Sequence, residues 1–61
     1  MRTGFSTRSG LELRLDIEGR YVVTGLNGEN LATIRVLDGK VTKIVRGELS
    51  VQQIRDIEAE L

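Results

Sequence analysis

The sequence contains no cysteine, histidine, proline or tryptophan. Without cysteine there is no disulfide, thiolate zinc site or thiol nucleophile, and without histidine the commonest metal ligand and general base are missing. We therefore expect no enzyme activity, no catalytic residue, no metal site and no cofactor. Apolar runs are short, so we also expect no membrane span and no signal peptide, as in a soluble cytoplasmic protein.

The chain is short as well, at 61 residues. A domain of about 60 residues hides only roughly 60% of the surface that its unfolded chain exposes, so a single copy is marginally stable unless something reinforces it. Because disulfides and thiolate metal sites are excluded, the remaining reinforcement is a second copy. We therefore expect a homodimer.

Three strands are predicted in the first half of the chain. Strict alternation of apolar and charged residues from Leu11 to Glu18 predicts a strand with one dry face. Its apolar positions are Leu11, Leu13, Leu15 and Ile17. The β-branched and aromatic segment from Arg20 to Leu26 predicts a second strand, and Asn27-Gly28 predicts a type I′ turn into a third.

This turn sets the register of the second and third strands. It places Val23 opposite Ala32 and Tyr21 opposite Ile34. An Asp-Gly turn at residues 38–39 then predicts a fourth strand over residues 40–46. The alternation of that strand is irregular, which indicates a β-bulge.

A helix is predicted at the C-terminal end. Its apolar stripe comprises Val51, Ile54, Ile57 and Leu61. Ser50 and Gln53 form a capping box at its start, and acidic residues at its end predict fraying after about Glu58. The predicted class is α+β: a four-stranded antiparallel meander followed by one C-terminal helix packed on one sheet face. Residues 11–61 form this single ββββα domain, and residues 1–10 form a flexible N-terminal segment or short edge strand.

The sheet face away from the helix is the candidate binding surface. On the predicted register it carries Glu12, Arg14, Asp16, Arg20, Val22, Thr24, Leu31, Thr33, Arg35 and Leu37. Residues 1–46 hold eight basic and five acidic side chains, a net charge of +3, whereas residues 47–61 hold one basic and four acidic side chains, a net charge of −3. A basic sheet and an acidic helix favour a phosphate-bearing partner on the sheet.

Segments of the chain resemble two families of small dimeric nucleic-acid-binding proteins. The first is the positive-cofactor-four coactivator family, which binds single-stranded nucleic acid. Its strands and helix entry are similar to the segments GRYVVTGLNG, GENLATIRVLDG and RGELSVQQI. This resemblance implies a dimeric basic channel in which the matching positions Arg20, Arg35, Lys40, Lys43 and Arg46 lie near the nucleic acid. That family stacks bases on aromatic side chains, and here only Phe5 and Tyr21 are available.

The carbon storage regulator family of translational repressors is a second resemblance. Residues 7–10 are similar to the Thr-Arg-rich strand of that family, which ends in glycine. Residues 25–28 are similar to its Gly-x-x-Gly hairpin, and residues 46–49 to the segment with its arginine before the helix. The characteristic Ala-Pro segment of that family is missing here.

We therefore predict a homodimeric regulatory module that binds single-stranded DNA or RNA through its basic sheet face. The candidate binding residues are Arg14, Arg20, Arg35, Lys40, Lys43 and Arg46. The alternative is a small protein-interaction or inhibitor protein, of the phage or mobile-element type, that binds a protein partner through Val22, Leu31 and Leu37. An idealised fold without a binding function is a third possibility.

Overall fold

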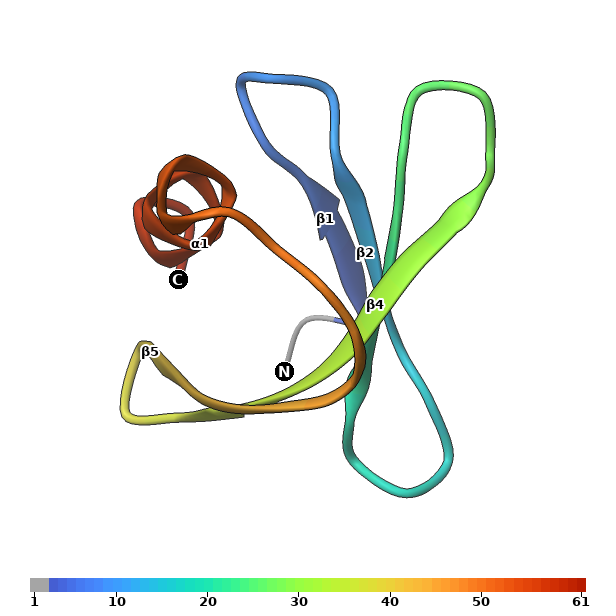
Figure 1. The fold of residues 1–61 in the computed structure, drawn as a ribbon. Coiled ribbons are helices and arrows are strands. Elements are labelled where there is room, and N and C mark those ends of the chain that lie inside the picture. Colours follow the sequence, from blue (N-terminus) through green and yellow to red (C-terminus); the bar gives the residue numbers. More distant parts are fainter. Residues whose placement is uncertain (1–2) are drawn as a thin grey trace.

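The fold is a five-stranded meander with one helix (Figure 1). The computed structural model describes residues 3–61. In chain order the elements are β1 (Gly4–Ser6), β2 (Glu12–Leu15), β3 (Tyr21–Thr24), β4 (Asn30–Leu37), β5 (Lys40–Gly47) and α1 (Val51–Glu58). All strands pair antiparallel in sequence order, and α1 contacts β5. The α+β class and the meander are confirmed. The sheet has five strands rather than four, because residues 4–6 form the short edge strand that was one alternative for the N-terminal segment.

Three successive hairpins share one loop geometry. The loops span residues 7–11, 16–20 and 25–29. In each loop the N–H of the first residue donates to the C=O of the fifth, at 2.8–2.9 Å. The fourth residue is a glycine with positive φ, at Gly10, Gly19 and Gly28. This is the three-residue loop with a glycine bulge. The type I′ turn predicted at Asn27-Gly28 is therefore wrong, since only Gly28 of that pair has positive φ.

The same loop geometry shortens the first long strand. Asp16 opens a loop, so β2 ends at Leu15 and Ile17 lies at the loop tip, fully exposed. The prediction that Ile17 belongs to the dry face is therefore wrong. An alternating pattern does not reveal where a strand stops, because the loop happens to continue the alternation.

The predicted register between β3 and β4 is nevertheless confirmed. Val23 lies opposite Ala32 and Tyr21 opposite Ile34. The loop after β3 is one residue longer than a type I′ turn, and a shift in the pairing makes Leu31 an extra residue on β4. The bulge at Leu31 compensates for the longer loop, which explains why a wrong turn led to the right pairs.

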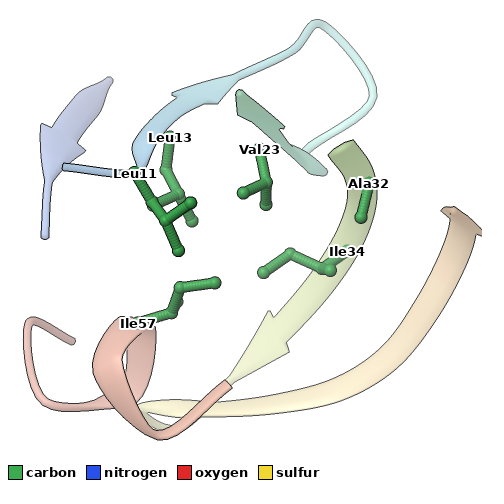
Figure 2. Close-up of a cluster of buried hydrophobic side chains, with 6 residues drawn as sticks. All are labelled: Leu11, Leu13, Val23, Ala32, Ile34 and Ile57. Atoms are coloured by element: carbon green, nitrogen blue, oxygen red, sulfur yellow. The ribbon is translucent and has the colours of Figure 1, made fainter. Parts of the chain in front are cut away.

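The inner face of the curved sheet holds the core (Figure 2). Its buried side chains are Leu11, Leu13, Val23, Ala32, Ile34 and Ile57. Ile57 is the contribution of α1 and is fully buried, whereas Val51 is 65% exposed and Leu61 39% exposed. The predicted four-residue stripe therefore reaches the core mainly through one side chain.

Helix α1 begins and ends as predicted. Ser50 accepts the N–H of Gln53 at 3.1 Å, and the Gln53 side chain accepts the N–H of Ser50 at 2.8 Å, which completes the capping box. Two carboxylates of the helix form hydrogen bonds with two other parts of the molecule, the first hairpin loop and β5. Asp56 accepts the N–H and the hydroxyl of Ser9 in the first hairpin loop, and Glu58 accepts the N–H of Val41 on β5 at 2.9 Å.

Candidate nucleic-acid interface

The sheet has a second face, pointing away from Ile57 and the core, which we call the outer face. Cross-strand pairing assigns its residues. One row of partners runs across all five strands through Gly4, Arg14, Val22, Thr33 and Arg46. Because side chains alternate along each strand, Arg35 and Leu37 on β4 share this face with Thr33.

Strand β5 places three cations on the outer face by means of two bulges. Lys40 lies opposite Leu37, Lys43 opposite Arg35, and Arg46 opposite Thr33. A regular strand would turn Lys43 to the inner face, since residues three apart point in opposite directions. The register shifts leave Thr42 and Val45 as extra residues, so a spacing of three becomes a spacing of two against β4.

The same bulges give β5 an apolar inner side. Val41 and Ile44 face Val36 and Ile34, and both pack against the core cluster. The predicted irregularity of this strand is thus confirmed as two bulges. These bulges place Val41 and Ile44 on the inner side of β5 and the three cations on its outer side.

Five of the six predicted binding residues meet on the outer face. They are Arg14, Arg35, Lys40, Lys43 and Arg46, and all are exposed. Among residues 3–61, the ion pairs that form involve none of these five side chains. Arg35 and Lys43 lie directly opposite each other, an arrangement of like charges that destabilises a sheet. This local cost is offset if a polyanion binds across the pair.

Arg20 is the predicted binding residue that does not join this group. Its guanidinium pairs with Asp16 at 3.3 Å and with Glu18 inside the loop over residues 16–20. The Arg20 N–H also donates to Asp16 at 2.9 Å. This backbone hydrogen bond is the main cause that holds the pKa of Asp16 below its ordinary value. Arg20 therefore completes a structured loop, and its charge is locally neutralised.

A second lowered pKa lies far from the outer face, at the contact between α1 and the first hairpin loop. The hydroxyl of Ser9 donates to the Asp56 carboxylate and is the main cause that holds the pKa of Asp56 below its ordinary value. Thr7 and the N–H of Ser9 act in the same direction. An acidic residue of the helix therefore holds α1 against the first hairpin loop.

Few acids accompany the outer-face cations. Glu12 lies two residues before Arg14 on β2 and shares its face. Asp38 occupies the type I′ turn between β4 and β5, where it adopts a positive φ of 53° beside Gly39, as its turn chemistry predicts. The outer face therefore keeps an excess of positive charge.

The predicted apolar interface is divided by the structure. Val22 is half-buried in the middle of the row between Arg14 and Thr33, and Leu37 is 65% exposed at the end of β4. Leu31, the bulged residue, packs instead against the core cluster. Its expected place on the uncovered face is therefore wrong, because the bulge changes the alternation at that position.

The aromatic side chains lie on the inner face. Phe5 pairs with Leu13, and Tyr21 pairs with Leu15 and Ile34. Their rings contact each other edge to face, with centroids 5.7 Å apart. The chain has no other aromatic side chain, and Phe5 also lines a hollow over β1 to β3.

The outer face also has a concave area over β1 to β3. Its lining combines small and polar residues with the apolar side chains of Phe5, Leu13 and Val22. The lining includes Gly4, Ser6, Glu12, Arg14, Val22, Thr24 and Asn30. Sequence reasoning missed this hollow, since it depends on which side chains the pairing of the strands brings together.

Other kinds of site find no support in the part of the chain from residue 3 onward. It contains no group of three or more histidine, cysteine or acidic side chains placed to hold a metal ion. None of its helices is long and apolar enough to cross a membrane. No family model, curated protein or solved structure matches the chain.

Proposed function

We propose that the protein binds nucleic acid through the outer face of its sheet. The observation that carries this proposal is the set of five exposed cations, Arg14, Arg35, Lys40, Lys43 and Arg46, gathered on one face without ion pairs among residues 3–61. Polyanion binding by such a surface is driven by the release of counterions from phosphates.

The spacing of the cations suits a phosphate backbone. The partners of Lys40, Lys43 and Arg46 on β4 are each two residues apart, so neighbouring cations are separated by about 7 Å along the strand. Arg14 lies three strands away from Arg46 in the same row, about 14 Å across the sheet. These separations let each side chain reach a different phosphate.

A double charge reversal tests this function. Arg35→Glu together with Arg46→Glu should lower the affinity for labelled nucleic acid by about tenfold or more at low salt, measured by fluorescence anisotropy. Arg55→Glu is the matched control, because Arg55 is an exposed cation on α1, the helix that covers the inner face. Circular dichroism verifies that each variant is folded. Equal affinities of the double variant and the control would refute the proposal.

Protein binding is the second candidate, through the apolar part of the outer face. Among residues 3–61, Leu37 and the half-buried Val22 supply the apolar surface of that face, a small area that favours nucleic acid over a protein partner. Salt separates the two, since phosphate contacts lose affinity steeply as salt rises. Binding that is insensitive to salt would favour a protein partner.

We also propose that the protein acts as a homodimer. The described core has six buried apolar side chains, a small number for a domain without disulfides. Light scattering at roughly 50 μM, well above the Kd of a dimer of about micromolar affinity, should give the mass of two chains. A mass of one chain of 6.8 kDa would refute the dimer.

A further inference from the structure

We infer that the nucleic acid on the outer face is duplex DNA, and that the hairpin of β4 and β5 enters its major groove. This inference rests on the proposed function and specifies its ligand. It replaces the single strand implied by the resemblance of the sequence to single-strand-binding families.

The position of the aromatic rings argues against a single strand. Sequence-tolerant single-strand binding depends on stacking of bases on aromatic side chains, which contributes much of the affinity. Phe5 and Tyr21 contact each other and pack against the core cluster, and Phe5, which also lines the hollow over β1 to β3, lies at the opposite edge of the sheet from Lys43 and Arg46. The outer face therefore offers charge and hydrogen bonds, which a duplex uses fully because its phosphates are denser than those of a single strand.

The hairpin of β4 and β5 has the shape that a groove requires. Strand β3 pairs with β4 only as far as Ile34, so residues 35–37 pair with β5 alone. The end of this hairpin is thus a two-stranded ribbon that extends past the other strands, beneath the helix in Figure 1. The major groove of B-form DNA is about 12 Å wide and admits a two-stranded β-ribbon.

The ribbon is also supported from behind. Val36 and Val41 on its inner side pack against the core cluster, and Glu58 of α1 accepts the N–H of Val41. The ribbon therefore keeps its outer side free while its inner side is held. A preorganised recognition element loses less entropy on binding.

The outer side of the ribbon carries groups that suit base edges. Arg35 and Lys43 lie side by side there, and arginine and lysine commonly bind the O6 and N7 acceptors of guanine. Arg46 and Arg14 lie further back on the sheet, where they would contact flanking phosphates. A-form RNA has a deep and narrow major groove that side chains cannot read, so the ribbon fits DNA.

The test compares ligands of equal length with the wild-type protein. Anisotropy titrations use a DNA duplex of roughly 20 base pairs, about two helical turns, its separate strands and the matching RNA duplex. We expect the DNA duplex to bind at least about tenfold more tightly than the others, with a log–log salt slope near −2.7 for the three phosphates that Arg14, Lys40 and Arg46 would neutralise. Salt-dependent binding that is equal or tighter for single strands or RNA would overturn this inference and leave the proposed function intact. Absence of binding to all four ligands would overturn both.

A modified duplex tests the groove itself. Glucosylated 5-hydroxymethylcytosine fills the major groove with sugar and leaves the phosphates accessible, so it should weaken binding by about tenfold if the ribbon enters that groove. Unchanged affinity would overturn the groove assignment.

Two variants complete the test. Val22→Trp places an aromatic ring between Arg14 and Thr33 on the outer face and should raise single-strand affinity by about tenfold through stacking, without a gain for duplex DNA. Asp38→Asn keeps a residue that tolerates positive φ while it removes a negative charge from the ribbon tip, and should tighten duplex binding. A loss of duplex affinity in the folded Asp38→Asn variant would contradict entry of the ribbon tip.

Discussion

The inner and outer faces of the sheet use the same strands for different purposes. On the inner face Val23 and Ile34 are fully buried, whereas on the outer face their neighbours Val22 and Arg35 remain accessible. Stability therefore depends on one set of alternate residues and the proposed binding on the other. Substitutions on one face should change one property and spare the other.

The largest expected effect is on the inner face. Ile34→Ala removes a fully buried side chain and should lower the free energy of unfolding by about 2–5 kcal/mol. Arg35→Ala, the next residue on the opposite face, should change it by no more than about 0.5 kcal/mol. Urea denaturation measures both. Equal losses of stability would contradict the division between the faces.

A smaller effect is expected at the helix cap. Ser50→Ala removes the acceptor for the Gln53 N–H and should cost about 1 kcal/mol in unfolding free energy. The helix closes the inner face, so DNA affinity of the folded variant should stay at the wild-type value. Ser50→Asp, which can still accept the N–H, is the matched control. A drop in affinity without unfolding would show that the helix contributes to binding.

The pH dependence should also separate the two properties. Asp16 and Asp56 have pKa values lowered by hydrogen bonds in the folded chain. A lowered carboxyl pKa adds stability that is fully present above the unfolded-chain pKa of about 3.9 and is lost as the pH falls through the folded value. The free energy of unfolding should thus decline below about pH 4. It should stay constant from about pH 8 to 5, because the chain has no histidine that would titrate in that range. A stability loss between pH 7 and 5, seen by thermal denaturation, would refute these assignments.

The smallest effect is expected at a loop tip. Ile17→Thr should change the unfolding free energy by less than about 0.5 kcal/mol, because Ile17 is fully exposed. Leu13→Thr is the comparison, since Leu13 is 2% exposed and faces the core. Chemical denaturation that ranks the two variants equally would place Ile17 in a contact surface, as the alternating sequence suggested.

Several features were predictable because one local pattern determines them. The capping box fixed the start of α1 at Ser50, and the Asp38-Gly39 turn was correctly identified. The pairs Val23–Ala32 and Tyr21–Ile34 were predicted from a two-residue turn, and they are right because the bulge at Leu31 compensates for the longer loop.

Other features depend on pairing that a single strand does not display. Asn-Gly suits both a type I′ turn and a glycine-bulge loop, so the loop at residues 25–29 could not be chosen from its dipeptide. A usable signal was the recurrence of Gly10, Gly19 and Gly28 at equal intervals, which marks three loops of one kind. For β5 the signal was a basic residue followed by an apolar residue or glycine, repeated every three residues. The three pairs are Lys40-Val41, Lys43-Ile44 and Arg46-Gly47, and a repeat of three in a strand indicates repeated bulges.

The chain-order sheet has a consequence for how the molecule reaches this structure. Every strand pairs with its neighbour in sequence, so each hairpin can form without a long loop closing first. The contact of Asp56 with Ser9 joins residues 47 positions apart and ties the helix to the first loop. We therefore expect rapid hairpin formation, on a scale of about 1–10 μs, to precede helix docking. Weakening the Ser9–Asp56 contact should mainly speed unfolding, because that contact forms late.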